Sequence, residues 1–467
     1  MTLQDSATER AAPRPAGFGL VFAVVAAGVL MANLDLFIVN VALPQIGSDL
    51  DNAPLSSVSW VLNAYAVVFA ALLVPAGNFA DRFGARATYL AGTAVFTLAS
   101  LACTLAPNIW TLVALRGLQA AGAAALIPAS LGLLLAAAPP EKRLGAIRGW
   151  TAVSGIATLG PAAGGLLTEI NWRWVFLVNV PIGLAVLIAG PRMLPRTPRR
   201  TKADLPDLLG AALFTAAIGV LALGLVKSPE WGWASAEVIG SLVGGILLLA
   251  LFVLRSARAA SPVLPLELLR LPTFATASLA SLLFAVPFAA LLLSCVLWLQ
   301  NVWDWSPLAT GLGLAPGPLM VPILALSAAG IVRRFGAALV SFAGCVVFVA
   351  GIAWWLAAMH TDSGYATGML PGMMLTGIGV GLTMPTLIGA GVTAVPPQSF
   401  STGSGVVTMA RQLGSVLGVA LLVAILDADA SATESAFDRG WWFTGGCAAL
   451  TGLACLCVGR TFRRRAD

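Results

Sequence analysis

MANLDLFIVNVALP, residues Met31–Pro44, lies inside a long apolar segment that runs from Phe18 to about Leu43 and carries a single acid, Asp35. A helix of this length crosses the roughly 30 Å hydrocarbon core of a bilayer. An ionised carboxylate at that depth costs several kcal/mol, so an intramembrane acid is a functional candidate by default. Asp35 is the only acid that we place inside a predicted membrane span, and the rest of the chain is interpreted as its scaffold, gate and partner.

The composition of the whole chain supports a membrane protein, because 59% of its 467 residues are hydrophobic and only 10% are charged. Apolar runs of about 20 residues recur from end to end. We therefore predict an all-α polytopic membrane protein with no soluble domain. Fourteen spans are expected, at residues 18–43, 57–77, 87–106, 109–136, 148–168, 174–194, 207–227, 234–254, 272–299, 306–330, 337–358, 366–393, 402–426 and 440–460.

The basic residues predict the orientation. With the N-terminus inside, the inner segments hold 21 Lys and Arg residues and the outer loops hold three, namely Arg173, Lys227 and Arg439. This asymmetry follows the positive-inside rule and places both termini in the cytoplasm. The net charge of +6 thus arises from basic residues that set the orientation in the membrane, and it does not indicate nucleic-acid binding. The six cysteines fall in apolar runs, where they are expected to pack, and the single histidine, His360, excludes a histidine-based metal site or proton relay.

The sequence contains an internal repeat. ADRFGARATYLAGTAVF begins at Ala80 and VRRFGAALVSFAGCVVF begins at Val332, and a shift of 252 residues superposes them. Two six-helix halves separated by two inserted helices follow, with the substrate path expected between the halves. The predicted parts are a tail at 1–17, a bundle at 18–194, a linker with the inserted helices at 195–271, a bundle at 272–460 and a tail at 461–467.

Two short motifs are candidate moving parts. In GNFADRFGAR, the predicted inner loop places Asp81, Arg82 and Arg86 around Gly84, which permits a turn at positive φ. This cluster is either an inner gate or a solvated charged turn. In GPAAGG, residues Gly160, Pro161, Gly164 and Gly165 predict a bent helix with a close contact, which is either a rocking seam or ordinary glycine packing.

Arg116 is the predicted partner of Asp35. It lies about 10 Å from the outer end of its span and Asp35 about 13 Å from the outer end of the first span, at 1.5 Å per residue. The matching depths permit an ion pair or a water-bridged contact, with Gln119 one turn further in. The pair is interpreted as a proton path, and a purely structural pair is the alternative.

Other polar residues in the predicted spans are weaker candidates. Arg411 lies near mid-depth, where it must reach a carbonyl, water, Asp35 or an anionic substrate. Trp172 and Trp174 are predicted to anchor the chain at the membrane interface. The weaker candidates for the substrate path are Asn40, Trp60, Asn63, Tyr65, Gln119, Gln300, Arg411 and Gln412.

Residues along nearly the whole chain resemble the major facilitator superfamily, and within it the fourteen-helix drug:proton antiporters. The first-helix signature of that family is similar to LDLFIVNVALP, residues Leu34–Pro44. WRWVFLVNVPIG, residues Trp172–Gly183, is the most specific element. The similarity also covers GPAAGG and Trp60, Tyr65, Gly77, Asp81, Arg82, Gly84, Arg86, Arg116, Gln119, Gly122, Gln300, Ser306, Pro307, Gly311, Pro316, Arg411, Gln412, Gly414 and Gly418.

The resemblance implies export of hydrophobic compounds in exchange for protons by alternating access. Asp35 and Arg116 would take part in proton coupling, the loop Asp81–Arg86 in gating and GPAAGG in the exchange motion. The sequence departs from the family pattern at Ala85, Ala120 and Gly155. Members that expel divalent organic cations tend to carry further acids in the membrane, so monovalent, neutral or zwitterionic substrates fit better here.

The resulting hypothesis is a bacterial inner-membrane exporter of small hydrophobic compounds, including antibiotics, that is driven by the proton gradient. A monomer among membrane lipids is expected, with no metal and no other cofactor. The alternatives are a dedicated exporter of one endogenous antibiotic or metabolite, an inward proton symporter, and a non-transporting membrane sensor or partner protein. A membrane enzyme is disfavoured and an ATP-driven pump excluded, because the sequence has no nucleophile–base pair, metal cluster or nucleotide-binding loop.

Overall fold

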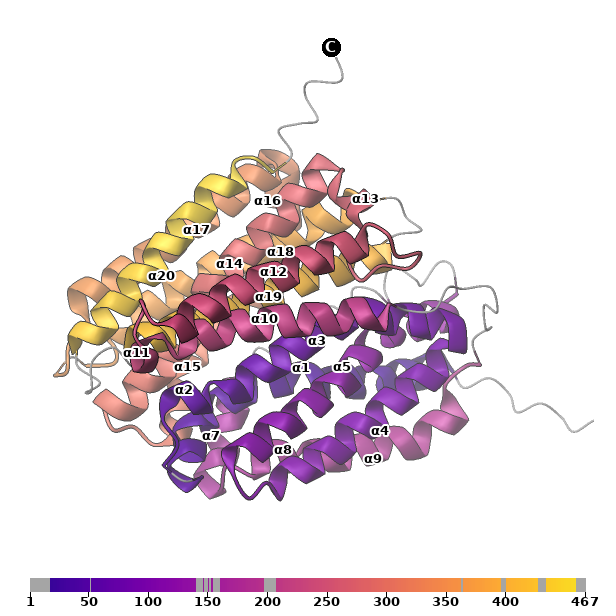
Figure 1. The fold of residues 1–467 in the computed structure, drawn as a ribbon, viewed down its shortest axis with the longest axis horizontal. Coiled ribbons are helices and arrows are strands. Elements are labelled where there is room, and N and C mark those ends of the chain that lie inside the picture. The colour runs from indigo at the N-terminus through magenta and orange to yellow at the C-terminus, as the bar shows by residue number, and fades with distance from the viewer. Residues whose placement is uncertain are drawn as a thin grey trace, which may run out of the picture.

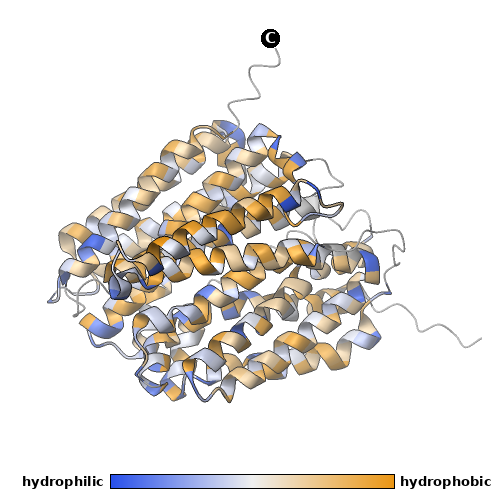
Figure 2. Cartoon of the chain, in the orientation of Figure 1, coloured by the Kyte–Doolittle hydropathy of each residue, from blue (hydrophilic) through white to orange (hydrophobic). Residues whose placement is uncertain are grey.

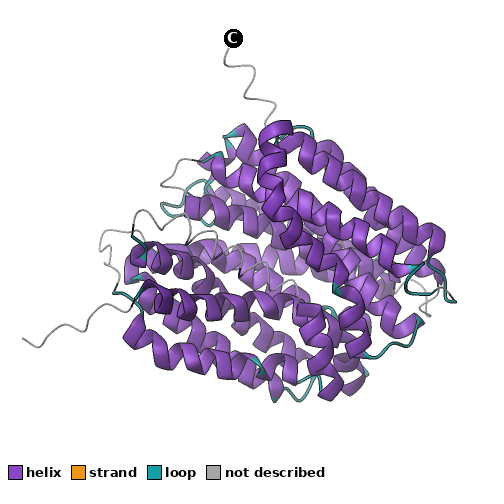
Figure 3. Cartoon of the chain, turned by 180° about the vertical axis from the view of Figure 1, so that it is seen from behind, coloured by secondary structure: helices purple, strands orange, loops and turns teal. Residues whose placement is uncertain are grey.

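The computed structural model describes residues 17–50, 52–139, 146, 150, 153, 160–196, 207–362, 364–395, 400–426 and 434–458. Within these ranges the regular structure is entirely helical (Figure 3). Eleven of the described helices are long and apolar enough to cross a membrane. Large apolar side chains such as Leu98, Ile188 and Leu247 are exposed along the helices, and hydrophobic residues predominate on the two helices of the inserted pair, α10 (Leu208–Val226) and α12 (Ala236–Ser256), in Figure 2. The predicted all-α polytopic membrane fold is therefore confirmed, with eleven candidate spans among the described residues.

The helices form two halves with an inserted pair (Figure 1). The first half contains α1 (Phe18–Asp49), α2 (Leu55–Val58), α3 (Trp60–Phe83), α4 (Ala85–Thr104), α5 (Ile109–Ala137), α7 (Gly160–Ile170), α8 (Trp174–Leu177) and α9 (Asn179–Met193). The inserted segment contains α10 (Leu208–Val226), α11 (Ser228–Trp231), α12 (Ala236–Ser256) and α13 (Leu266–Leu269). The second half contains α14 (Pro272–Leu297), a π-helical turn (Trp298–Val302), α15 (Pro307–Leu314), α16 (Pro316–Phe335), α17 (Ala337–Ala358), α18 (Met369–Thr393), α19 (Phe400–Leu426) and α20 (Glu434–Cys455).

We call the end of the bundle where α1 ends and α3 begins the outer end, following the predicted orientation. The opposite end, where α3 ends and α4 begins, is the inner end. The predicted tenth span differs from the structure, because a break at Ala315 divides it into α15 and α16. Residues 1–16 and 461–467 of the predicted tails, and most of residues 148–159 of the predicted fifth span, lie outside the described residues.

The sequence repeat is also a structural repeat at the inner end. Gly84 follows α3 with φ 97°, and Gly336 follows α16 with φ 83°. Only glycine adopts such φ values without strain, so each half turns here in the same way. Arg82 lies over the ring of Phe83 at 5.8 Å, and Arg334 lies over the ring of Phe335 at 5.3 Å.

Small residues hold the equivalent helix pairs close together. A Cβ on Gly92 of α4 would lie 2.7 Å from the carbonyl oxygen of Gly122 on α5. In the second half, a Cβ on Gly344 of α17 would lie 2.9 Å from the carbonyl oxygen of Gly379 on α18. Within a bilayer such close packing replaces the hydrophobic effect as the force between helices.

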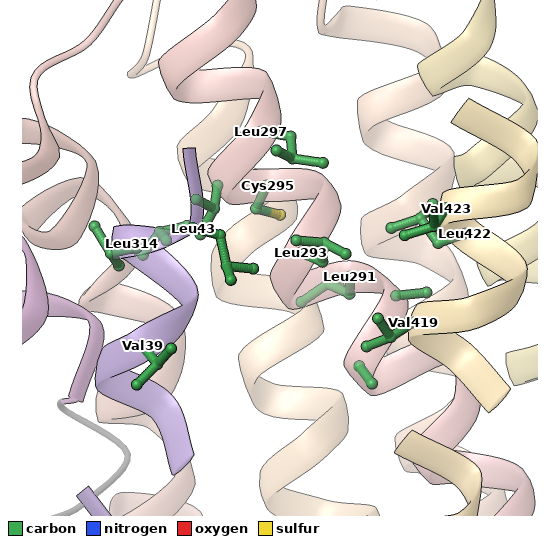
Figure 4. Packing of buried hydrophobic residues seen from close by; sticks show 14 of the residues in the cluster. Val39, Leu43, Leu291, Leu293, Cys295, Leu297, Leu314, Val419, Leu422 and Val423 are labelled. Carbon is green, nitrogen blue, oxygen red and sulfur yellow. The ribbon is translucent and has the colours of Figure 1, made fainter. Parts of the chain in front are cut away.

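A buried apolar cluster joins the two halves toward the outer end. It combines Val39 and Leu43 of α1 with Leu297 of α14, Leu314 of α15 and Val419 of α19 (Figure 4). The helix that carries Asp35 is thus packed against the second half as well as against its own.

The inserted helices cover the seam where α3 meets α19. α10 packs against both of these helices, and α12 packs against α10 (Figure 1). Phe214 of α10 lies in a buried cluster with Ala70 of α3 and Val406 of α19, and its ring is 5.1 Å from that of Phe252 on α12. The inserted pair therefore contacts both halves rather than forming a separate unit.

Asp207 fixes the start of this inserted pair. Its buried carboxylate accepts a hydrogen bond from the Gly210 amide at 2.9 Å and pairs with Arg255 Nη2 of α12 at 3.1 Å. We expect Asp207→Ala to lower the free energy of unfolding by about 2 kcal/mol, because both a cap and an ion pair are lost. Ser235→Ala removes only a cap, at Val238, and should cost about 1 kcal/mol.

The measurement is thermal unfolding of both variants in detergent beside the wild type. An equal loss of stability in the two variants would show that the Asp207–Arg255 pair contributes nothing beyond the cap.

Candidate functional site

Asp35 lies at the centre of a buried hydrogen-bond network. Its side chain is 0% exposed and that of Arg116 is 1% exposed. Asp35 Oδ2 accepts a hydrogen bond from Arg116 Nη1. Asp35 Oδ1 accepts from Gln119 Nε2 at 2.9 Å and from Asn179 Nδ2 at 3.0 Å. Donors from α5 and α9 therefore converge on the acid of α1, and the predicted ion pair is present.

Arg116 has further partners besides Asp35. Its Nε donates to the carbonyl oxygen of Val61 at 3.1 Å, and its Nη1 donates to Gln119 Oε1 at 2.6 Å. The guanidinium carbon lies 4.2 Å from the ring centre of Tyr65 and 5.6 Å from that of Phe176. Cations are attracted to aromatic faces, and more so away from water. The cation is thus held from several sides and can change its main partner without becoming isolated.

Two residues of this network have no role in the sequence prediction. Asn179 binds Asp35 directly, and Ser100 accepts a hydrogen bond from Gln119 Nε2 at 2.7 Å. Asn179 belongs to the WRWVFLVNVPIG segment and is a polar residue at the start of α9, ahead of an apolar run that reaches Gly190. Such residues are expensive in a membrane and mark function, so the sequence could have indicated Asn179 as a candidate, although not that it binds Asp35.

A cavity of about 90 Å³ lies between the two halves next to Arg116. Helices α1, α3 and α5 line one side, and α14 and α19 line the other. Of the predicted substrate-path residues, Asn40, Asn63, Tyr65, Arg411 and Gln412 line it together. A larger cavity of about 270 Å³, near Pro44, has no charged residue among the described residues that line it; Ser48, Asn52 and Asn301 are its polar side chains. We therefore place the site in the smaller cavity, which is lined by two arginines and by five of the predicted residues.

Several polar atoms in this cavity lack hydrogen-bond partners. They are both side-chain ends of Asn63, the Tyr65 hydroxyl, Arg411 Nε and Gln412 Nε2. Buried polar groups are normally hydrogen-bonded, and leaving them unpaired is costly. Residues of α3 and α19 therefore bring unpaired polar groups to one cavity between the halves.

Three predicted substrate-path residues lie outside the cavity lining. Gln119 lies in the Asp35 network, and Trp60 is at the start of α3 with its indole nitrogen buried and unpartnered. Gln300 Nε2 donates to the carbonyl oxygen of Val41 at 3.0 Å. Gln300 thus connects α1 to the second half instead of facing the cavity.

The GPAAGG motif contacts both α1 and the second half. A Cβ on Gly164 would lie 2.5 Å from the carbonyl oxygen of Ile38, and one on Gly160 would lie 2.5 Å from Phe37 Cβ. On the opposite side of α7, a Cβ on Gly165 would fall on the carbonyl oxygen of Pro307 in α15. The motif therefore joins the helix of Asp35 to the other half of the molecule.

Two further contacts strengthen this seam. A Cβ on Gly311 of α15 would fall on the carbonyl oxygen of Pro161. Glu169 Oε2 accepts a hydrogen bond from the Leu308 amide at 3.1 Å, close to the start of α15. A carboxylate at a helix N-terminus is electrostatically favoured. Backbones of the two halves are thus in direct contact near the outer end.

The predicted inner loop is partly described. Arg86 Nη2 donates to the carbonyl oxygen of Pro191 on α9, which ties the start of α4 to the end of α9. Arg82 lies over Phe83, and Gly84 has the positive φ expected of it. The side chain of Asp81 lies outside the described residues.

One aromatic prediction is wrong. Trp172 is 0% exposed, so it does not anchor the chain in lipid. Its indole nitrogen donates to Asp49 Oδ2 at 2.9 Å, and Arg173 lies over its ring at 4.3 Å. Trp172 therefore fixes the outer end of α1, while Trp174 is 43% exposed as an interfacial residue would be. In the part of the chain that the structure describes, no three His, Cys, Asp or Glu residues are grouped as metal ligands.

A central cavity between two helical halves, next to a buried ion pair, is the arrangement of a membrane transporter. The family profile described as Major Facilitator Superfamily matches residues 25–419. The chain belongs to the major facilitator superfamily. Together with its many apolar helices, this makes it a multi-pass protein of the bacterial inner membrane.

The curated relatives are resistance and export proteins. A tetracenomycin C resistance and export protein of Streptomyces glaucescens is 35% identical, over 89% of this chain and 77% of the relative. The multidrug resistance protein Stp of Mycobacterium tuberculosis is 36% identical, over 87% of this chain and 75% of its own length. A methylenomycin A resistance protein of Streptomyces coelicolor is 33% identical, over 87% of this chain and 86% of the relative.

Solved structures agree on the fold. A D-xylose-proton symporter matches with a TM-score of 0.68 at 12% identity, covering 94% of this chain and 97% of that one. An auto-inhibited peptide transporter of the POT family matches with a TM-score of 0.67 at 19% identity, covering 95% of this chain and 97% of that one. At such identities these matches establish the shared architecture alone.

Proposed function

We propose that the protein is a proton-coupled exporter of small hydrophobic compounds that works by alternating access. The observation that carries this proposal is the fully buried Asp35–Arg116 pair beside a cavity between the two halves. An intramembrane acid paired in this way is expensive to maintain and marks an ion or proton path. The identities with resistance and export proteins support the outward direction and a transporter rather than an enzyme.

The network suggests how proton and substrate exchange. A proton that binds Asp35 removes the negative charge opposite Arg116, and the guanidinium then turns toward Gln119 and the Val61 carbonyl. Because Arg116 also lines the cavity, its displacement changes the site that holds the substrate. Loss of the proton on the other side of the membrane restores the pair. The proton gradient is thus the energy source in this proposal, and no ATP is used.

The seam at GPAAGG transmits the change. α1 carries Asp35 and rests on Gly160 and Gly164, while Gly165 on the same helix meets α15. A shift of α1 therefore acts directly on the outer contact between the halves. The inner loop, with Arg86 bound to the end of α9, is the corresponding candidate at the inner end.

The finer topology is part of the proposal. Fourteen spans arranged as six, two and six require α7, α16 and α20 to cross the membrane in addition to the eleven candidates. Both termini are then cytoplasmic, as the distribution of basic residues favours. A monomer surrounded by lipid is sufficient, because the cavity is formed within one chain.

A dedicated exporter of a single antibiotic is the second candidate. It is favoured by relatives whose names refer to one compound, tetracenomycin C or methylenomycin A. A narrow substrate profile would distinguish it from a multidrug exporter.

The test is transport by the purified protein in liposomes with an imposed pH gradient. The panel comprises tetracenomycin C, methylenomycin A, puromycin, ethidium and tetraphenylphosphonium. We expect at least one compound to move against its gradient, and dissipation of the pH gradient with nigericin to stop this movement. Substrate movement that is indifferent to nigericin would contradict proton coupling. A response to one compound only would select the dedicated exporter.

A further inference from the structure

Arg411 is the charged residue of the cavity that the Asp35 network does not use. It lies on α19, and its side chain is partly exposed to the cavity while its Nε is buried without a hydrogen-bond partner. Among the described residues, no carboxylate forms a salt bridge with it. A cation at membrane depth without a counter-charge is costly, so its retention calls for a partner.

The charges around the cavity are unequal. Arg116 and Arg411 both line it, and no acid is among the described residues of the lining. Asp35 lies behind Arg116, and both of its carboxylate oxygens are already occupied by Arg116, Gln119 and Asn179. The charge of Arg116 is therefore balanced and that of Arg411 is not. A ligand with a negative group is attracted to this side of the cavity, and a cation is repelled from it.

The other unsatisfied groups near Arg411 are mostly donors. Gln412 Nε2, the Asn63 amide nitrogen and the Tyr65 hydroxyl all lack partners. Carboxylate oxygens accept several hydrogen bonds, and a guanidinium binds them with two parallel ones. Leu36, Phe288 and Leu292 add apolar surface to the same cavity.

We propose that the cavity selects compounds that carry a carboxylate or similar oxyanion on an apolar body, and that Arg411 binds the anionic group. This inference rests on the proposed export function and specifies its substrate class. It narrows the sequence-based expectation of monovalent, neutral or zwitterionic substrates to those with a free anionic group.

The charge of the substrate also decides which force drives export. A monoanion that leaves in exchange for one entering proton moves two positive charges inward per cycle, whereas a monocation moves none. The membrane potential acts on every charge that crosses. Export of an anion is therefore driven by the potential as well as by the pH gradient.

Three probes with one aromatic body test the inference: 2-naphthoate, its methyl ester and 2-naphthylmethyl-trimethylammonium. Binding to the purified full-length protein is measured by calorimetry at pH 7, and proton release is followed in the same weakly buffered detergent solution. We expect wild type to bind naphthoate at least tenfold more tightly than the ester, and the cation least tightly.

The variants assign this preference to one residue. Arg411→Gln should reduce the ratio of the affinities for naphthoate and for its ester to about one, and it should do so by weakening the binding of naphthoate. Arg411→Lys keeps the charge and should retain part of this preference. The control is Arg192→Gln, which removes an exposed arginine of α9 and should change nothing. Should Arg411→Gln not fold, Arg411→Lys decides the outcome: the ratio of affinities must fall below that of wild type, and an unchanged ratio overturns the assignment to Arg411.

The outcomes separate the two proposals. Equal or tighter binding of the ester or the cation by wild type overturns the inference, and so does a preference for naphthoate that survives Arg411→Gln. Failure of all three probes to bind overturns it as well. Naphthoate binding that depends on Arg411 but never releases a proton supports the anion site and contradicts proton exchange instead.

Discussion

Asp35→Asn is expected to reduce proton-driven export at least 100-fold and to abolish proton release on substrate binding. Asparagine is similar in size and keeps an oxygen that accepts from Gln119 and Asn179, which both bind Asp35. It cannot carry a titrating proton, however, so the exchange has no acid to load. The measurement is proton release from the purified protein on addition of a transported compound, with wild type and variant side by side.

The variant should remain folded, although breaking a buried pair often costs about 3–5 kcal/mol. Arg116 keeps the Val61 carbonyl and Gln119 Oε1 as acceptors and remains over the ring of Tyr65. We therefore expect a lower melting temperature but retained binding of substrate. Binding measured by calorimetry separates a loss of coupling from a loss of structure.

Asp35→Glu is the matched control, because it restores the titrating group with one extra methylene. Partial recovery of proton release in this variant, together with none in Asp35→Asn, would assign the proton to this position. Equal proton release from wild type and Asp35→Asn would instead make Asp35 a structural partner of Arg116 and place the proton site elsewhere.

The sequence predicted this pair because helix geometry is regular. A fixed rise per residue places Asp35 and Arg116 at similar depths whatever the neighbouring helices do. The same regularity made Gly84 and its repeat Gly336 predictable, since each must allow a turn at positive φ between two helices. These features depend on position along one or two helices only.

Other features depend on which helices become neighbours, and here the sequence was insufficient. Asn179 reaches Asp35 only because α9 packs against α1. From the sequence, Trp172 has the features of an interfacial anchor, but in the structure its indole nitrogen donates a hydrogen bond to Asp49 of α1. The place of α10 over the seam of α3 and α19 has no signal in its own residues, because an apolar helix packs equally well against protein and lipid.

Gly165→Val is expected to prevent the outer end from closing and to reduce transport at least 100-fold. Any Cβ at this position falls on the Pro307 carbonyl and lies 3.1 Å from Gly311 Cα, both of which belong to the other half. Backbone atoms cannot rotate away as a flexible side chain does, so the halves must separate. The conformation with an open outer end does not require this contact. The variant should therefore accumulate in that conformation with its fold intact.

The position distinguishes gating from packing within one half. Gly164, the preceding residue, lies against Ile38 of its own half, so Gly164→Val should reduce stability instead. Gly446→Val on α20 is the matched control, because a Cβ there meets nothing within 4 Å. Melting temperatures of the three variants should therefore fall for Gly164→Val and remain close to wild type for the other two.

Spin labels at Leu105 and Asp362, one exposed site in each half, report the separation at the outer end. In wild type we expect a mixture of short and long distances that shifts with pH, because protonation of Asp35 alters the seam through α1. In Gly165→Val only the long distance should remain, at every pH. A wild-type distribution in this variant, with transport retained, would mean that α7 and α15 do not form the outer gate. The pH response would then have to reach the outer end through another contact, such as the hydrogen bond from Gln300 to the Val41 carbonyl.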